Sequence, residues 1–170
     1  MTLTLVLGGA RSGKSAHALE LAQAAADGRL LTLVATAQAF DEEMADRIAR
    51  HRAERGPQWR TIEAPLALAE VLDALGPQDV AVVDCLTLWL SNVMLSELDV
   101  AANTDALLAA AARTRGQVFY VSNEVGLSIV PDNVLARRFR DEAGRLNRLM
   151  AARADRVTIL FAGLPLQLKP

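Results

Sequence analysis

Eight residues close to the start of the chain have the types and spacing of a phosphate-binding loop, or P-loop. They are Gly8, Gly9, Ala10, Arg11, Ser12, Gly13, Lys14 and Ser15, which match the pattern G-x-x-x-x-G-K-S. Glycines let the backbone turn successive N–H groups toward an anion, and the following helix presents its positive end. Lys14 can neutralise the β- and γ-phosphates, and the Ser15 hydroxyl can ligate Mg²⁺. The loop predicts nucleoside triphosphate binding, and a glycine-rich surface turn is the alternative.

An acidic residue ends an apolar run in the middle of the chain. Residues 80–83 are Val-Ala-Val-Val, and Asp84 follows them. In P-loop proteins a carboxylate at this place holds Mg²⁺, directly or through water. Taken alone, Asp84 is better explained as a loop residue or a helix cap, since many strands end in Asp. In combination with the P-loop, it is predicted to contact metal or nucleotide.

A charged segment at residues 41–55, DEEMADRIARHRAER, has the spacing of a helix. Met44, Ile48 and His51 would share one face, with arginines on both sides of the histidine. In one interpretation His51 is a packed or solvated helix residue. In the other, the arginines bind a triphosphate and His51 is a nucleophile, because nearby cations lower the imidazole pKa and keep it neutral. Spacing alone leaves both interpretations open.

A second polar cluster follows an apolar run at residues 118–122. Asn123 and Glu124 come directly after this run. A carboxylate at a strand end could orient a substrate hydroxyl or act as a general base.

Apolar and amphipathic segments alternate along the chain and must position these groups. Strands are predicted at residues 3–7, 30–35, 59–62, 80–83, 118–122, 157–161 and 164–168. Helices are predicted at 15–26, 41–55, 65–75, from 87, at 104–115, and from a cap at 132 or 133 to 153. This alternation predicts an α/β fold of the P-loop NTPase class, with a mainly parallel sheet and helices on both faces. Ligands of such sheets bind at the carboxyl ends of the strands.

Composition narrows the possible classes of protein. The 170 residues favour a single nucleotide-binding domain, 1–170, and the net charge of −2 gives no global basic field for nucleic acid. The single cysteine, Cys85, excludes an internal disulfide and fits a reducing compartment. Because neither a signal peptide nor a membrane span is apparent, the expected location is cytoplasmic.

Several motifs, taken in their order and spacing, resemble one enzyme family. They are residues 8–15 (GGARSGKS), 35–37 (ATA), 47–52 (RIARHR), 59–63 (WRTIE), 123–126 (NEVG), 129–133 (IVPDN) and 139–141 (FRD). Together they are similar to the bifunctional adenosylcobinamide kinase / adenosylcobinamide-phosphate guanylyltransferase family. The resemblance covers essentially the whole chain.

The resemblance implies two reactions of late cobalamin biosynthesis. The first phosphorylates the aminopropanol hydroxyl of adenosylcobinamide with ATP or GTP. The second transfers GMP from GTP to that phosphate through a guanylyl-histidine, which gives adenosylcobinamide-GDP and pyrophosphate. The resemblance further implies a RecA-like sheet and a homotrimer, and Mg²⁺ is the cofactor expected for the P-loop.

Site residues are carried over from the family position by position. His51 matches the guanylylated histidine, and Lys14 is the second residue expected to be catalytic. The expected nucleotide contacts are residues 8–15, Ala35, Thr36, Ala37, Arg52, Ala53, Glu54, Arg55, Glu63 and Asp84. Ser15 and Asp84 are the expected metal ligands, and Glu124 and Asn123 are candidates for substrate binding or base catalysis.

The chain departs from the family pattern at two positions. Relatives often carry paired histidines where this chain has Arg50 and His51, which leaves one candidate nucleophile. The acid after the fourth strand can be Glu in relatives and is Asp84 here. Two rival functions follow from the residues alone: a monofunctional P-loop small-molecule kinase, which does not need His51, and a nucleotide-binding regulatory module without small-molecule chemistry.

Overall fold

One seven-stranded sheet organises the part of the chain that the computed structural model describes, residues 2–37 and 57–170. The strand order is β3-β2-β4-β5-β1-β6-β7. The strands are β1 (Leu3–Gly8), β2 (Leu30–Ala35), β3 (Trp59–Glu63), β4 (Asp79–Asp84), β5 (Gln117–Asn123), β6 (Arg156–Phe161) and β7 (Leu164–Lys169). All neighbouring pairs are parallel except β6 and β7. The prediction of a mainly parallel sheet is therefore confirmed.

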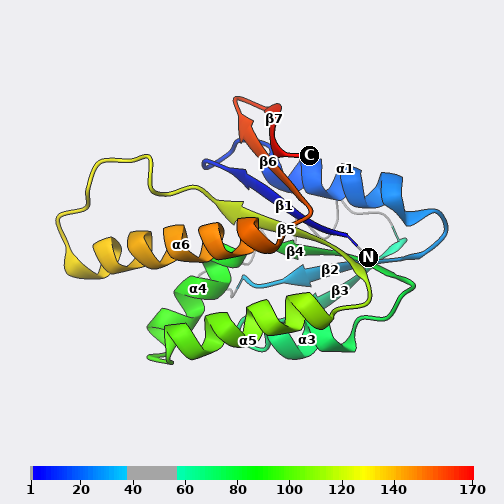
Figure 1. Ribbon diagram of the computed structural model, residues 1–170, viewed down its shortest axis with the longest axis horizontal. Helices are drawn as coiled ribbons and strands as arrows, with labels where there is room; N and C mark the ends of the chain where they lie inside the picture. Colours follow the sequence, from blue (N-terminus) through cyan, green and yellow to red (C-terminus); the bar gives the residue numbers. More distant parts are fainter. Residues whose placement is uncertain (1, 38–56) are drawn as a thin grey trace.

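Helices cover both faces of the sheet, as predicted (Figure 1). Helix α1 (Lys14–Ala26) lies on one face, where Ala18 and Ala22 pack against Val6, Val82 and other strand residues. On the opposite face lie α3 (Leu68–Ala74), α4 (Leu86–Leu95), α5 (Val100–Arg113) and α6 (Val134–Arg153). Alternate residues of each strand point to opposite faces, so two separate cores form. None of these helices, in the residues described, is long and apolar enough to cross a membrane.

Two helix boundaries depend on side chains that accept hydrogen bonds from the first turn. The Asn133 side chain accepts from the Ala136 N–H at 2.7 Å, so the cap predicted at residue 132 or 133 is Asn133. The Asp99 side chain accepts from the Ala102 N–H at 3.0 Å and starts α5 at Val100. The prediction of a start at residue 104 was wrong because it overlooked this cap.

Helix α3 begins later than predicted. A start at Pro65 was expected, but the helix runs from Leu68 to Ala74. The Pro65 carbonyl accepts a hydrogen bond from the Asn92 side chain at 3.0 Å, and the Leu66 carbonyl accepts one from the Trp89 ring at 3.1 Å. These tertiary contacts use carbonyl groups that a helix starting at Pro65 would have directed along its own axis.

The last strand lies at the edge of the sheet, as predicted, and it forms a hairpin with β6. Ala162 and Gly163 connect them, and both have positive φ (50° and 81°), which suits a tight two-residue turn. The turn lies beside the P-loop, since a Cβ placed on Gly13 would be 3.9 Å from the Gly163 Cα.

The strand register brings the polar residues predicted for the site to one edge. Gly8 pairs with Asn123, and Ala35 pairs with both Asp84 and Glu63. All these residues lie at the carboxyl ends of their strands, which is where ligands of parallel sheets bind.

Candidate nucleotide and phosphoryl-transfer site

The P-loop connects β1 to α1 at the carboxyl edge of the sheet. Gly8 is the last residue of β1, and Lys14 is the first residue of α1. Gly13 has φ +88° and Arg11 has φ +54°, both in the left-handed region. Left-handed backbone in a non-glycine residue such as Arg11 is characteristic of ligand-binding turns. The loop therefore has the strand-turn-helix setting that the sequence motif requires.

The first glycine of the loop is required by close packing. A Cβ on Gly8 would lie 2.3 Å from the Ser12 Oγ and 3.1 Å from the Leu160 carbonyl oxygen. The Ser12 hydroxyl is buried and has no hydrogen-bond partner in the described chain. A side chain at position 8 would displace Ser12 and open the turn.

Lys14 is nearly buried, with a relative exposure of 9%. Its Nζ donates to the Gly9 carbonyl at 3.0 Å, which folds the side chain back across the loop. The ammonium is thus held within the turn whose N–H groups would surround an anion.

The hydroxyl of Ser15 and the carboxylate of Asp84 meet directly. Ser15 Oγ donates to Asp84 Oδ1 at 3.1 Å, and the two residues come from the start of α1 and the end of β4. A hydroxyl and a carboxylate are the hard oxygen donors that Mg²⁺ takes together with phosphate oxygens and water. The donor set therefore fits the metal expected from the sequence. The described residues, this site included, contain no group of three or more His, Cys, Asp or Glu that could hold a metal ion.

Thr36 is fully buried and holds the backbone next to Asp84. Its hydroxyl accepts from the Cys85 N–H at 2.8 Å and donates to the Cys85 carbonyl at 2.8 Å. Its own N–H donates to the Asp84 carbonyl at 3.2 Å. The Thr36 side chain is therefore engaged within the protein, and its role is to position Asp84.

Glu63 lies farther along the same edge. Four strand spacings separate β3 from β1 in the sheet order, which amounts to roughly 19 Å between Glu63 and Gly8 at about 4.8 Å per spacing. Asp84, which Ser15 of the P-loop contacts, is nearer, since two strand spacings or roughly 10 Å separate β3 from β4.

Asn123 and Glu124 lie beside the P-loop, but their side chains are already engaged. Asn123 Nδ2 donates to the Thr87 hydroxyl at 2.7 Å. The Glu124 N–H donates to the Gly8 carbonyl at 3.0 Å, and its Oε1 accepts from the Gly126 N–H at 2.9 Å. Glu124 is thereby fixed at the base of the loop.

Sequence reasoning missed a set of buried amides that support this edge. Asn92 Nδ2 donates to the Thr36 carbonyl at 2.8 Å and to the Pro65 carbonyl at 3.0 Å. Asn147 accepts from the Ser122 hydroxyl at 2.6 Å and donates to the Asn123 carbonyl at 3.0 Å. The available signal for Asn92 was its position as an amide in the apolar helix LTLWLSNVML, since a polar group on a buried face needs partners.

Cys85 follows Asp84 and is buried beneath the site. Burial raises the pKa of its thiol, and the neighbouring Asp84 carboxylate raises it further. Its sulfur lies 3.2 Å from the Thr87 hydroxyl. The thiol is thus kept neutral, which suits a packing role and not a nucleophilic one.

Several predicted residues lie outside the described part of the chain. These are His51 and the arginine-rich segment around it, with Arg47, Arg50, Arg52, Ala53, Glu54 and Arg55. Ala37, the last described residue before them, follows β2 at the carboxyl edge of the sheet.

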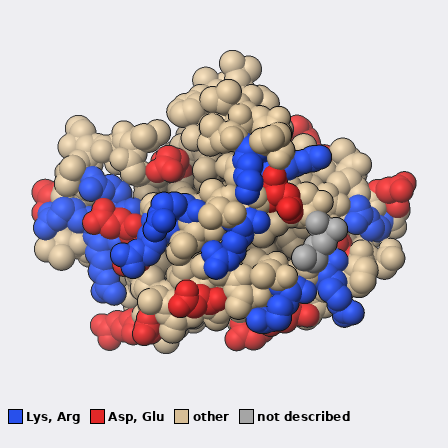
Figure 2. All heavy atoms as spheres, in the orientation of Figure 1, with Lys and Arg blue, Asp and Glu red and all other residues tan. Residues whose placement is uncertain are grey.

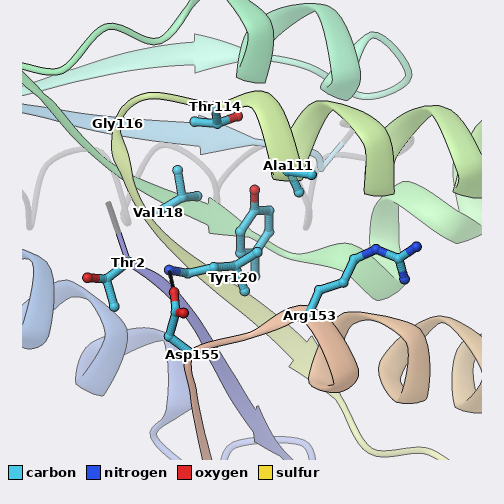
Figure 3. Close-up of a pocket in the computed structure, with 10 residues that line it drawn as sticks. Thr2, Ala111, Thr114, Gly116, Val118, Tyr120, Arg153 and Asp155 are labelled. Atoms are coloured by element: carbon cyan, nitrogen blue, oxygen red, sulfur yellow. Dashed lines mark hydrogen bonds between the residues drawn. The ribbon is translucent and has the colours of Figure 1, made fainter.

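A hollow of about 280 Å³ lies at the opposite end of the sheet (Figure 3). Thr2, Val118 and Tyr120 line it together with Arg153 and Asp155 near the end of α6. The Tyr120 hydroxyl is buried and has no partner among the described residues. None of the predicted site residues lines this hollow, so it is separate from the P-loop site.

Solved structures with the same fold share little sequence with this chain. Flagellar accessory protein FlaH from Methanocaldococcus jannaschii is 16% identical, with a TM-score of 0.53, over 99% of this chain and 78% of its own. A second solved structure, of an ATPase domain, is 14% identical, with a TM-score of 0.52, over 94% of this chain and 69% of its own. At this identity the likeness shows the fold, a RecA-like P-loop NTPase, as predicted.

Sequence comparisons identify the family. The family of cobinamide kinase / cobinamide phosphate guanyltransferase, CobU, matches residues 4–168. The bifunctional adenosylcobalamin biosynthesis protein CobP of Pseudomonas aeruginosa is 49% identical over 97% of this chain and 96% of its own length. The protein CobU of Escherichia coli, also named as bifunctional, is 38% identical over 98% and 99%. With a P-loop, a converging serine and aspartate, and full-length relatives, this chain belongs to the CobU family of cobinamide kinases and cobinamide phosphate guanyltransferases, which are transferases.

Proposed function

We propose that both reactions of this family take place at the carboxyl edge of the sheet, in one nucleotide-binding domain. The first uses ATP or GTP to phosphorylate adenosylcobinamide, and the second transfers GMP from GTP to adenosylcobinamide phosphate. The observation that carries the proposal is the meeting of Ser15 with Asp84 at 3.1 Å beside the P-loop. This arrangement serves triphosphate chemistry because it provides metal ligands where the β- and γ-phosphates would lie.

In the kinase step, the P-loop holds the triphosphate and the substrate hydroxyl attacks the γ-phosphorus. The bond from the γ-phosphorus to the bridging oxygen breaks, and the nucleoside diphosphate leaves. Lys14 neutralises charge that develops on the transferred group. Glu124, which is anchored to Gly8 through its N–H, is the proposed acceptor of the hydroxyl proton, and Asn123 fixes the strand end that carries it.

Mg²⁺ is the proposed cofactor, and Ser15 and Asp84 would hold it. When bound, the ion neutralises charge on the phosphate oxygens. The short side chain of Asp84 reaches the Ser15 hydroxyl without an intervening residue, so a small octahedral ion can take both ligands directly or through water.

In the guanylyl step, a ring nitrogen of His51 attacks the α-phosphorus of GTP, and pyrophosphate leaves. An oxygen of adenosylcobinamide phosphate then attacks the same phosphorus and releases His51, which gives adenosylcobinamide-GDP. Arg52 and Arg55, together with Ala53 and Glu54, are the proposed contacts for this nucleotide from the same segment. Guanidinium groups suit the task because they bind phosphate in a bidentate manner.

The nucleoside end of the nucleotide is proposed to extend over Ala35, Thr36 and Ala37 toward Glu63. The register places Ala35 between Asp84 and Glu63. A carboxylate can accept hydrogen bonds from the N1–H and the 2-amino group of guanine. Adenine has neither of these two donors. Glu63 is therefore the proposed source of preference for GTP.

The chain is also proposed to act as a cytoplasmic homotrimer. The trimer follows from the family resemblance, and the exposed strand β7 supports self-association. Leu164, Leu166 and Leu168 of β7 are all more than half exposed, and an open apolar edge strand favours pairing with another chain. Light scattering on the full-length protein measures the mass, and a monomer would contradict this part of the proposal.

A labelling experiment tests the guanylyl step. The protein is incubated with Mg²⁺ and GTP labelled at the α-phosphate, without cobinamide, and then denatured. We expect a protein adduct that is labile in acid and stable in base, as phosphoramidates are. The adduct should disappear in His51→Ala and persist in His17→Ala, which removes the other histidine of the chain.

Three results would contradict the proposal. An adduct that survives in His51→Ala would assign the nucleophile to another residue. Phosphorylation of cobinamide without any adduct or GMP transfer would favour the monofunctional kinase. Binding of GTP with neither reaction would favour a regulatory module.

A further inference from the structure

A group of exposed apolar side chains lies just beyond the P-loop, on the segment that connects β5 to α6 and on the first turn of α6. Its exposed side chains are Leu127, Ile129, Val130, Val134 and Leu135, which we call the apolar loop surface. Ile129 is 93% exposed and Leu127 is 75% exposed. Figure 1 shows the segment extending away from the carboxyl edge of the sheet before α6 returns. Exposed apolar side chains that are contiguous, unlike scattered ones, mark an interaction site.

A hollow of about 280 Å³ continues this surface between α4 and α6. Met94 and Leu95 from α4 and Leu135 and Phe139 from α6 contribute most of its apolar walls. Leu135 belongs both to the hollow and to the apolar loop surface, so the two are joined.

The surface begins at the phosphoryl-transfer site. Glu124 is hydrogen-bonded to Gly8 of the P-loop at 3.0 Å, and the uncharged segment starts at the next residue. Ser128 Oγ donates to the Val125 carbonyl at 3.0 Å, and Arg137 donates to the Pro131 carbonyl at 3.0 Å. These bonds hold the segment at both ends. The segment therefore starts directly beside the P-loop.

The apolar loop surface also offers polar groups, which come from its backbone. Residues 125–131 contain no charged side chain, and Figure 2 shows a group of uncharged residues at the upper left of the molecule, where the segment lies in Figure 1. The N–H groups of Leu127, Ile129 and Val130 donate no hydrogen bond to the part of the chain that the structure describes. The surface therefore combines apolar side chains with available backbone donors.

We propose that the apolar loop surface, with the adjoining hollow, binds the corrin ring of the cobinamide substrate. This inference rests on the proposed function, because it concerns the acceptor of the same phosphoryl group. A corrin macrocycle has broad apolar faces and a fringe of neutral amide groups, which match the apolar side chains and the backbone N–H groups. Its flexible hydroxyl-bearing arm would reach past Glu124 to the P-loop. The amide fringe needs no charged partner, and residues 125–131 present none.

Steady-state kinetics of Ile129→Ser test the proposal in the full-length protein. We expect the KM for adenosylcobinamide to rise roughly tenfold, since one large apolar contact is lost. The KM for GTP and the yield of histidine adduct without cobinamide should stay unchanged. Leu30→Ser is the matched control, because Leu30 is 45% exposed at the amino end of β2. Val130→Ser provides a second variant, should Ile129→Ser fail to fold.

Two results would overturn the proposal. The first is an unchanged KM for adenosylcobinamide in folded Ile129→Ser and Val130→Ser. The second is a change in mass by light scattering in these variants, because the surface would then be a contact between copies of the chain. Equilibrium dialysis of cobinamide against wild type and variants measures binding without turnover. Weaker binding by the variants supports this surface even if the wild type shows no GMP transfer. The binding measurement therefore tests the corrin-binding surface separately from the proposed function.

Discussion

The Ser15 hydroxyl donates a 3.1 Å hydrogen bond to the Asp84 carboxylate across 69 residues of sequence. The bond joins the start of α1 to the end of β4, although β5 lies between β4 and β1 in the sheet. The bond is possible because α1, which begins in the P-loop, packs against residues of both β5 and β4. Two oxygen donors from distant segments are thereby preorganised before any nucleotide arrives.

Asp84→Asn is expected to lower both reaction rates and to raise the Mg²⁺ concentration that each reaction needs. The amide keeps the size of the side chain and a hydrogen bond to Ser15, but it removes the negative charge that attracts the ion. We expect losses of roughly 100-fold, measured as rate against Mg²⁺ concentration. Asp73→Asn is the control, since Asp73 forms an exposed ion pair with Arg113. An unchanged Mg²⁺ dependence in Asp84→Asn would exclude this residue from the metal site.

Lys14→Ala is expected to reduce the kinase rate by roughly 100- to 1,000-fold, because it removes a preorganised charge from the phosphate loop. Single-turnover phosphorylation of adenosylcobinamide measures the effect. Lys169→Ala removes the other lysine of the chain, which is bonded to backbone carbonyls near the end of α6, and should react normally. A normal kinase rate in Lys14→Ala would remove the P-loop lysine from the mechanism.

Glu63→Gln is expected to weaken the preference for guanine. The wild type should use GTP better than ITP, which lacks the 2-amino group, because a carboxylate accepts from both guanine donors. In the variant the ratio of kcat/KM for the two nucleotides should approach one. Glu70→Gln, in the first turn of α3, is a control that should keep the ratio. If Glu63→Gln leaves the GTP-to-ITP ratio of kcat/KM unchanged, Glu63 does not contact the guanine ring.

Thr36→Val is expected to lower the free energy of unfolding by about 1–3 kcal/mol, because it leaves the buried Cys85 N–H without an acceptor. Thr36→Ser keeps the hydroxyl and should lose less. Urea unfolding measures stability, and GTP titration measures whether displacement of Asp84 also weakens nucleotide binding. Equal stability of the two variants would mean that the hydroxyl does not hold this backbone.

Tyr120→Phe is expected to leave stability unchanged or to increase it by about 1 kcal/mol, because the buried hydroxyl has no partner in the described chain. Burial raises the pKa of the Tyr120 hydroxyl in the folded state. The folded protein is therefore expected to lose stability as the pH rises above about 10, because the hydroxyl ionises more easily in the unfolded chain than in the folded one. Urea unfolding at alkaline pH should show a steeper loss for wild type than for Tyr120→Phe. Parallel pH profiles would contradict this assignment.

The fold could be predicted from the sequence because the strongest signals in the sequence are local. The apolar run of β1, the glycines of the P-loop and the helical spacing of α1 follow one another without a gap, so they predict strand, turn and helix together. Element boundaries were less predictable where distant side chains decide them. Pro65 could not be excluded from α3 without knowledge that Asn92 uses its carbonyl.

The sequence by itself determined which residues are candidates to hold phosphate and metal, because Lys14, Ser15 and Asp84 are identified by motif and by position after a strand. It could not determine that Thr36 faces inward to the Cys85 backbone, or that β3, which ends in Glu63, lies two strands away from β4, which ends in Asp84. Those facts depend on strand order and register, which bring together residues that no local pattern connects. Tertiary structure alone decided how the carboxyl edge is arranged, since the order of strands in a sheet follows from packing across the whole chain.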